Sequence, residues 1–127
     1  MKQYKKILVA YDGSKGANKA LREAMILAEK FYGIIVLTQI IYEKTEEEIR
    51  SQLKSIEERI KKSGIECTTR VECDMYPPRK IVRVARDEAC DLIIIGRRGV
   101  REANYWAMGS VSKRVVEDAY CPVLVVK

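Results

Sequence analysis

Residues 6–14 read KILVAYDGS, a short apolar run that stops at an Asp-Gly pair and is followed by a serine. A continuously apolar run is typical of a strand buried on both faces of a sheet, so we expect a strand over residues 6–11. Ser14 is then placed to cap a helix, whose apolar residues recur every three or four positions until Gly33 ends it. This stretch predicts a strand, a turn and a helix, the first unit of an α/β fold.

The same alternation of strand and helix continues along the rest of the chain. Four further apolar runs are expected to form strands, over residues 34–41, 65–72, 91–95 and 122–126. We therefore expect one domain over residues 1–127, built on a mostly parallel sheet with helices on both of its faces. Five strands fit a flavodoxin-like order or a closely related nucleotide-binding order.

The three later helices have recognisable starting points. Thr45 and Glu48 have the spacing of a capping box, and the helix that follows them is expected to end near Gly64. Pro77 begins the next helix. Its inward residues are expected to be Ile81, Val82, Ala85 and Ala89. The last helix is expected over residues 110–119.

The composition removes several classes of function. The 127 residues contain no histidine and carry a formal net charge of +6. Without imidazole, Ser-His-Asp and Cys-His nucleophile pairs and the usual histidine zinc sites are excluded, so we assign no catalytic and no metal-binding residue. The basic N-terminus runs into an apolar stretch too short for a signal peptide or a membrane span. We therefore expect a cytoplasmic protein with no membrane partner.

The four cysteines, Cys67, Cys73, Cys90 and Cys121, lie far apart without a Cys-x-x-Cys spacing. This pattern argues against a zinc knuckle and against a thioredoxin-like redox pair, and favours buried free thiols. Cys90 and Cys121 each directly precede an expected strand, so they lie at the same end of the sheet if those strands are neighbours. Whether these two form a disulfide stays open.

A glycine-rich segment between the fourth strand and the fourth helix carries the strongest functional pattern. Gly96 and Gly99 enclose two arginines, and nine residues then separate Gly99 from Gly109-Ser110. Glycines let the backbone approach a phosphate or ribose closely, and a helix N-terminus offers N–H groups to an anion. From residue 96 to residue 114, five basic residues and one acidic residue give a local charge of +4. The alternative is that the glycines only turn the chain and the arginines only solvate it.

The chain resembles the universal stress protein family in several motifs at once. These are VAYDGS after the first strand, DLIIIGRRG, GSVS and the closing CPVLVV. The ATP-binding branch of that family is marked by the same Gly-x2-Gly-x9-Gly-Ser/Thr spacing. The resemblance implies an adenine nucleotide alpha hydrolase-like, Rossmann-like fold with parallel strands in the order 3-2-1-4-5. It also implies binding of ATP or AMP, with or without Mg²⁺, and no general catalytic chemistry.

The resemblance also assigns residues to parts of the nucleotide. It places Asp12 at the adenine and ribose end and Ile40 in apolar contact with adenine. It places Gly96 and Gly99 along the ribose and α-phosphate, and it places the phosphates on Gly109, Ser110, Val111 and Ser112. Arg97, Arg98 and Arg101 are each candidate partners of a phosphate. Tyr105 and Trp106 either cover this site or pack against a partner subunit. The chain is shorter than the family pattern, chiefly around its second helix. Insertions there would normally help to cover the pocket, so the resemblance does not define the rim of the pocket.

Two other functions compete with nucleotide binding. An adenylate-transferring or ATP-hydrolysing enzyme of the related alpha-hydrolase type shares the architecture, but the sequence positions no obvious general base. Nucleic-acid binding through the basic loop would depend strongly on salt and compete with ATP. The sequence lacks the interleaved aromatic and basic residues of an RNA-binding sheet, so we expect no nucleic-acid partner. The expected function is that of a regulatory, stress-response nucleotide-binding protein with at most weak ATPase activity.

Self-association follows from the expected last strand. If it lies at the edge of the sheet, the residues from Val123 to Val126 expose an apolar row of unpaired backbone groups. Proteins normally cover or pair such an edge, so we expect a homodimer through this strand, as the family resemblance also implies.

Overall fold

Strand and helix alternate along the chain in a computed structural model that describes residues 4–42, 45–97 and 108–127. The elements in chain order are β1 (Lys6–Ala10), α1 (Lys15–Phe31), β2 (Ile34–Ile41), α2 (Glu46–Lys62), β3 (Glu66–Cys73), α3 (Pro77–Asp87), β4 (Leu92–Gly96), α4 (Ser110–Asp118) and β5 (Val123–Val126). Each predicted strand and helix is present, and the strand boundaries differ from the predicted ones by at most one residue.

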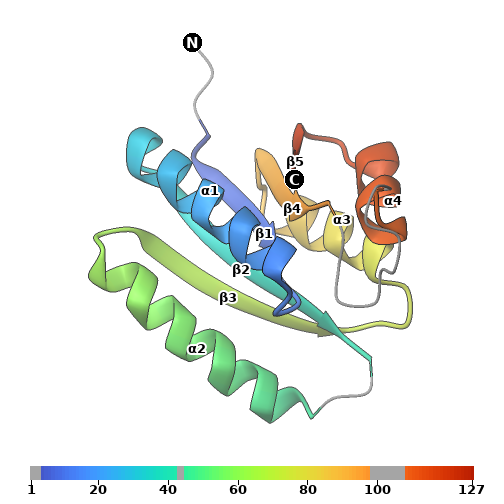
Figure 1. The fold of residues 1–127 in the computed structure, drawn as a ribbon, viewed down its shortest axis with the longest axis horizontal. Helices are drawn as coiled ribbons and strands as arrows, with labels where there is room; N and C mark the ends of the chain where they lie inside the picture. The colour runs from blue at the N-terminus through green and yellow to red at the C-terminus, as the bar shows by residue number, and fades with distance from the viewer. Residues whose placement is uncertain (1–3, 43–44, 98–107) are drawn as a thin grey trace.

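The five strands form one parallel sheet in the order β3-β2-β1-β4-β5, which confirms the predicted fold class and strand order (Figure 1). Ala10 of β1 pairs with Thr38 of β2 on one side and with Ile95 of β4 on the other. The direction of winding therefore reverses between β1 and β4, since the chain moves outward to β3 and then returns to the far side of β1.

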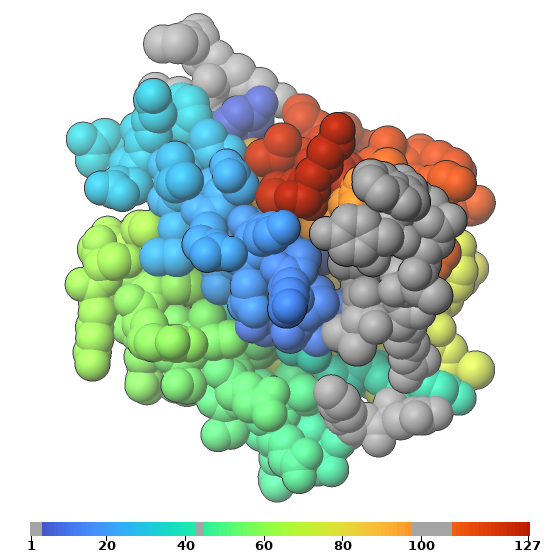
Figure 2. Space-filling view, in the orientation of Figure 1, coloured from blue at the N-terminus to red at the C-terminus, as the bar shows by residue number. Residues whose placement is uncertain are grey.

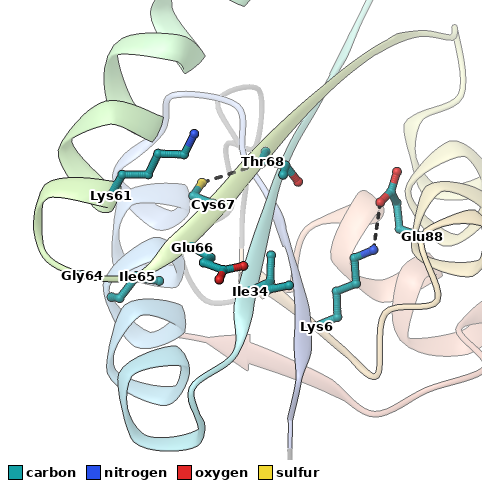
Figure 3. A pocket seen from close by; sticks show the side chains of 9 residues that line it. All are labelled: Lys6, Ile34, Lys61, Gly64, Ile65, Glu66, Cys67, Thr68 and Glu88. Carbon is teal, nitrogen blue, oxygen red and sulfur yellow. Dashed lines mark hydrogen bonds and ion pairs between the residues drawn. The ribbon is translucent and has the colours of Figure 1, made fainter.

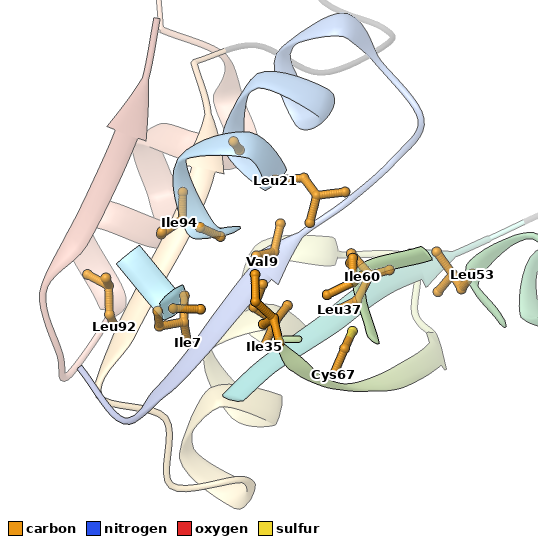
Figure 4. Close-up of a cluster of buried hydrophobic side chains, with 14 of the residues drawn as sticks. Ile7, Val9, Leu21, Ile35, Leu37, Leu53, Ile60, Cys67, Leu92 and Ile94 are labelled. Atoms are coloured by element: carbon orange, nitrogen blue, oxygen red, sulfur yellow. The ribbon is translucent and has the colours of Figure 1, made fainter. Parts of the chain in front are cut away.

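Alternate residues of each strand face two separate hydrophobic cores. Ile7 and Val9 point into the core under α1 and α2, which Figure 4 shows. Leu8, between them, points into the core under α3 and α4. All three side chains are fully buried, so β1 is covered on both faces. At one edge of the sheet, the C-terminal segment with β5 lies beside α1 (Figure 2).

Two local predictions about helix ends are wrong. Thr45 is the N-cap of α2, but its side chain accepts no capping hydrogen bond, so the capping box does not form. Three glutamates in the first turn, Glu46, Glu47 and Glu48, lie instead at the positive end of the helix dipole, which favours negative charge. Ala89 does not point inward: it is exposed, follows the end of α3, and has a φ of 56°.

The backbone around Ala89 explains this second difference. Cys90 donates its N–H to the carbonyl of Ala85 at 2.8 Å, and Ala89 donates to Arg86 at 3.1 Å. These two bonds form a Schellman motif, in which the left-handed position usually belongs to glycine. Tyr32 takes the same left-handed position after α1, with a φ of 55°. The neighbouring Gly33 is required for another reason, because a Cβ there would lie 2.6 Å from the carbonyl oxygen of Tyr4.

A chain of ion pairs covers the face of β3 that lies opposite α2. Arg70 of β3 contacts Glu88 at 2.6 Å, and Glu88 also pairs with Lys6 of β1 at 3.2 Å. Arg70 further contacts Glu72 at 3.2 Å, and Glu72 pairs with Lys80 of α3 at 3.6 Å. These side chains tie β1, β3 and α3 together. In the described residues, no helix is long and apolar enough to cross a membrane.

Replacing Ala89 by glycine is expected to stabilise the protein by about 1 kcal/mol, because glycine adopts the left-handed conformation without the penalty of a Cβ. The free energy of unfolding in urea measures this effect. Ala20→Gly in the middle of α1 is the control and should destabilise the protein, since its backbone is helical. An Ala89→Gly variant that is less stable than the unaltered protein would contradict the assigned backbone conformation.

The ion pairs of Glu88 are expected to make stability depend on acid pH. The hydrogen bond from Arg70, with a further contribution from Lys6, lowers the pKa of Glu88 below its ordinary value of 4.5. This stabilisation is complete above about pH 4.5 and is lost as the pH falls through the lowered pKa. Urea unfolding of Glu88→Gln at neutral and acid pH should show a smaller loss of stability in acid than the unaltered protein shows.

An exposed glutamate on α2 supplies the control for this experiment. Glu58→Gln should retain the acid dependence of the unaltered protein, because Glu58 takes part in none of these ion pairs. If the free energy of unfolding falls in acid by the same amount in Glu88→Gln and in the unaltered protein, Glu88 is not the cause of this pH dependence.

Candidate functional site

The candidate site lies at the carboxyl edge of the sheet, where β1 and β4 end side by side. From this edge β1 leads into α1 on one face, and the connection after β4 leads to α4 on the other face (Figure 1). In open α/β sheets, ligands bind beyond the carboxyl ends of the strands at the point where the winding reverses. The geometry of three segments therefore matters: the turn after β1, the end of β2, and the two ends of the connection between β4 and α4.

A tight turn holds Asp12 at the end of β1. Its Oδ1 accepts the backbone N–H of Ser14 at 3.0 Å, and the Oγ of Ser14 accepts the N–H of Ala17 at 3.0 Å, which caps α1 as predicted. Gly13 between them has a φ of 83°, a conformation that suits glycine. The turn uses one carboxylate oxygen of Asp12 and fixes the half-buried side chain at the sheet edge.

Tyr11 connects the same turn to its neighbours. Its backbone N–H donates to the carbonyl of Thr38 on β2 at 2.8 Å, and its hydroxyl donates to the Oδ1 of Asn18 on α1 at 2.8 Å. Burial raises the pKa of the Tyr11 hydroxyl, so it keeps its proton as a donor. Neither Tyr11 nor Asn18 was predicted as a site residue, since their contact depends on how α1 folds back over β1.

Ile40 lies near the end of β2, the strand that neighbours β1. Ala10, the last residue of β1, pairs with Thr38, and Asp12 and Ile40 each lie two residues beyond this pair along the chain. The Ile40 side chain is half-buried and packs against the core under α3 and α4. The structure thus brings the two residues expected at the adenine end to adjacent chain segments.

Gly96 allows the first turn of α1 to approach β4 closely. A Cβ at Gly96 would lie 2.7 Å from the carbonyl carbon and 2.8 Å from the carbonyl oxygen of Gly16. Carbon atoms do not approach this closely, so any larger residue at position 96 would push α1 away from the sheet. Gly96 was predicted to make room for ribose or phosphate, whereas the space for its missing side chain is filled by α1. Gly16, the second residue of this contact, had no functional prediction.

Arg97 joins β4, β5 and α4 through its backbone. Its N–H donates to the carbonyl of Val126 at 2.8 Å, and its carbonyl accepts the N–H of Gly109 at 2.7 Å and the hydroxyl of Ser112 at 2.7 Å. The Ser112 hydroxyl is also 3.0 Å from the carbonyl of Gly109. The two ends of the glycine-rich connection are therefore held together. Gly99, Arg98, Arg101, Tyr105 and Trp106 lie outside the described residues.

The start of α4 has the features of an anion site. Its N-cap, Gly109, has no side chain and thus no side-chain capping bond. The first intrahelical bond is donated by Lys113 to Gly109, so the N–H groups of Ser110, Val111 and Ser112 precede it at the positive helix end. Ser110 is exposed, Val111 is half-buried, and Ser112 is buried with its hydroxyl proton already donated to backbone carbonyls.

Neither the cleft at the opposite edge of the sheet nor the acidic side chains of the described residues add to this candidate site. A shallow cleft of about 550 Å³ lies at the opposite, amino edge of the sheet, between Lys6, Ile34 and Glu66 (Figure 3). Lys6 is engaged with Glu88 there, and ligands of open α/β sheets do not bind at this edge. No group of three or more Cys, Asp or Glu side chains in the described part of the chain is arranged to hold a metal ion.

All four cysteines are free thiols in the structure, including Cys90 and Cys121, whose pairing the sequence left open. Burial raises the pKa of Cys67 to about 12, and burial likewise raises the pKa of Cys90 to about 12. A thiol with such a high pKa is not an activated nucleophile, because the reactive form is the thiolate.

Comparison with known proteins gives consistent matches over the whole chain. The sequence model of the universal stress protein family matches residues 3–127. The universal stress protein Sll1388 of Synechocystis is 33% identical over 152 residues, which cover 98% of both proteins. The solved structure of the hypothetical protein MJ0577 superposes with a TM-score of 0.89 at 28% identity and covers 99% of this chain and 97% of its own.

A further structural match was solved with a nucleotide. It is a universal stress protein from Archaeoglobus fulgidus in complex with dAMP, with a TM-score of 0.73 and 26% identity. The match covers 99% of this chain and 100% of the other.

Replacing Gly96 by alanine is expected to cost about 1–3 kcal/mol of stability, because the new methyl group overlaps the backbone of Gly16. The strain should appear at the start of α1. Hydrogen exchange of the Asn18 amide, which donates to Ser14 at 3.0 Å, should therefore become faster.

Gly64→Ala is the control for this variant. Gly64 follows α2 with a φ of 89° and open space around it, so its substitution strains the backbone far from the candidate site. Gly64→Ala should lose stability without changing the exchange of the Asn18 amide. The same exchange rate in both variants would argue against the contact between Gly96 and Gly16.

Proposed function

Because the chain belongs to the universal stress protein family, we propose that it binds an adenine nucleotide, ATP or AMP, at the carboxyl edge of its sheet. It acts as a regulatory module in which nucleotide binding is the functional event. The observation that carries the proposal is the start of α4, which begins at a glycine without a side-chain cap beside the carboxyl ends of β1 and β4. The dAMP complex of the Archaeoglobus fulgidus relative supports the same class of ligand.

The proposed nucleotide lies across the edge from β2 to α4. Asp12 and Ile40 contact the adenine and ribose, at the level where β1 and β2 end. The phosphates lie at the N-terminus of α4, where backbone N–H groups favour anions. The residues that this proposal places along the ribose and phosphates are Gly96, Arg97, Gly99, Gly109, Ser110, Val111 and Ser112. Gly96 contributes through its backbone, because α1 occupies the space beside it. Ser112 contributes its backbone N–H, because its hydroxyl proton is donated to Arg97 and Gly109.

The proposed role of Arg97 combines two parts of the residue. Its backbone holds Gly109 and Ser112 in place, and its guanidinium supplies positive charge next to the phosphates. When Mg²⁺ accompanies the nucleotide, the Asp12 carboxylate and the Ser110 hydroxyl are the oxygen ligands that it prefers. Our proposal includes slow hydrolysis or none, since the sequence positions no obvious general base for water.

The proposal extends to a homodimer through β5. This strand lies at the edge of the sheet, where one side of its backbone has no neighbouring strand among the described residues. Leu124 on β5 is 37% exposed, so the edge is also apolar. A second copy would cover both features, as protein edges generally require. The four free thiols fit a reducing compartment, and we place the protein in the cytoplasm.

Equilibrium titration with ATP tests the proposed function. Fluorescently labelled ATP should bind the purified protein in the presence of Mg²⁺, with unlabelled AMP as a competitor and UMP as the control for adenine. No binding below about 1 mM, which corresponds to roughly −4 kcal/mol, would contradict the proposal. Sedimentation of a monomer at micromolar concentration would contradict the dimer alone.

Substitution of Asp12 separates its role in the turn from its role in binding. In Asp12→Asn the amide oxygen still accepts the N–H of Ser14, so the stability should change little. The affinity for ATP should fall about fivefold, because a neutral acceptor forms weaker hydrogen bonds than a carboxylate by roughly 1 kcal/mol. The same ATP titration measures the affinity, and urea unfolding measures the stability.

Asp12→Ala is the companion variant and should lose both the turn and the ligand contact. Unchanged ATP affinity in both variants would leave Asp12 with the turn alone.

A further inference from the structure

The outer face of α3 carries a row of arginines. Arg79, Arg83 and Arg86 are all exposed and follow one another at spacings of four and three residues, so they share one side of the helix. With a rise of 1.5 Å per residue, they lie about 6 Å and about 4.5 Å apart along the helix axis. Their row lies on the outside of α3, which packs beside α4 on one face of the sheet (Figure 1).

Acidic side chains of the described residues do not neutralise these three arginines. None of the three takes part in an ion pair within the part of the chain that the structure describes. The acids nearby are engaged elsewhere: Glu88 with Arg70 and Lys6, and Glu117 and Asp118 of α4 with Arg114. Asp87 is exposed at the end of the helix. Asp74 lies beside the other end, where its Oδ1 accepts the N–H of Tyr76 at 2.8 Å. The three positive charges of the row therefore have two carboxylates near them, Asp74 and Asp87, that form no ion pair in the described residues.

A tyrosine ring lies at each end of the row. The guanidinium carbon of Arg79 is 5.3 Å from the centre of the Tyr76 ring, and that of Arg86 is 4.9 Å from the centre of the Tyr120 ring. Tyr120 follows α4, yet its hydroxyl donates to the carbonyls of Ala85, at 2.8 Å, and Cys90, which anchors the ring at the end of α3. The rings are 42% and 44% exposed.

These five residues, Tyr76, Arg79, Arg83, Arg86 and Tyr120, form what we call the α3 surface. Three basic side chains lie between two aromatic ones, in a way that the sequence conceals, because Tyr120 comes from a distant part of the chain. Surfaces that bind single-stranded nucleic acids combine positive charge along the backbone with aromatic rings on which bases stack.

We propose that the α3 surface binds single-stranded nucleic acid, with the three arginines on successive phosphates and the two tyrosines stacked on unpaired bases. A base stacks on the ring face that the arginine leaves open. A duplex fits less well, because its bases are already stacked on one another and offer no face to the tyrosines. An acidic peptide would satisfy the arginines but gives the two rings no flat partner. The surface is separate from the nucleotide site, so this proposal is independent of the proposed function.

Binding of a short fluorescein-labelled oligo(U) to the full chain, followed by fluorescence anisotropy, tests this proposal. The logarithm of the affinity should fall with the logarithm of the salt concentration with a slope of about −2, as expected for three phosphates on a single strand. Arg83→Glu should weaken binding at least tenfold, since it inverts the central charge without touching either tyrosine. Tyr76→Ala should weaken binding about tenfold through loss of stacking.

Arg22→Glu is the matched control, because Arg22 is an exposed arginine on α1, on the opposite face of the sheet. It makes the same change in net charge and should leave the affinity within about twofold of the unaltered protein. Equal losses in Arg83→Glu and Arg22→Glu would overturn the proposal, because binding would then follow net charge alone.

Three further outcomes would also overturn the proposal. The first is the absence of oligo(U) binding at low salt. The second is displacement of oligo(U) by ATP, which would assign binding to the basic connection after β4. The third is displacement of oligo(U) by polyglutamate at equal charge concentration. This result would indicate that the α3 surface binds an acidic protein segment. Retention of oligo(U) against both competitors, together with the loss in Arg83→Glu, would support it.

Discussion

The close approach of α1 to β4 is the contact on which the carboxyl edge of this protein depends. The backbone of Gly16 fills the space where a side chain at Gly96 would lie, so two glycines permit a helix and a strand to touch. This contact sets where α1 begins, and the turn at Asp12 must then close over a short distance. It also sets where β4 ends, and hence where the glycine-rich connection leaves the sheet. The contact between the backbones of α1 and β4 thus positions the polar groups at the carboxyl edge of the sheet.

A second constraint acts through the carbonyl of Arg97. It accepts hydrogen bonds from the N–H of Gly109 and the hydroxyl of Ser112, while the N–H of the same residue binds Val126 of β5. The backbone of one residue, Arg97, therefore joins β4, the edge strand and the start of α4. The buried Ser112 donates its hydroxyl proton to backbone carbonyls, so this hydroxyl holds the structure together. We therefore expect the backbone N–H groups at the start of α4, and not the Ser112 hydroxyl, to bind an anion. Glycine at the N-cap suits this arrangement, because no side chain competes with the ligand for those groups.

Sequence patterns were reliable for whole strands and helices, whereas single capping hydrogen bonds were predicted correctly at Ser14 and wrongly at Thr45. Apolar runs located all five strands, because strands inside a parallel sheet are apolar on both faces. The spacing of Thr45 and Glu48 predicted a capping bond that does not form, and the left-handed positions are occupied by Tyr32 and Ala89 where glycine is usual. Such details depend on about 1 kcal/mol per residue and on neighbours elsewhere in the chain. Burial of a whole strand involves far larger free energies.

The sequence by itself determined the α/β class, the elements and the segments around the candidate site, because these follow from periodicity and from the spacing of glycines. Through the family resemblance it also indicated the strand order that the structure confirms. Only the tertiary structure decided that Gly96 faces Gly16, that β1 pairs with β2 as far as Ala10 and Thr38, and that Tyr120 rests on the end of α3. The physical reason is distance along the chain: these contacts join residues that no local pattern relates, and they exist only once the sheet fixes the positions of the helices.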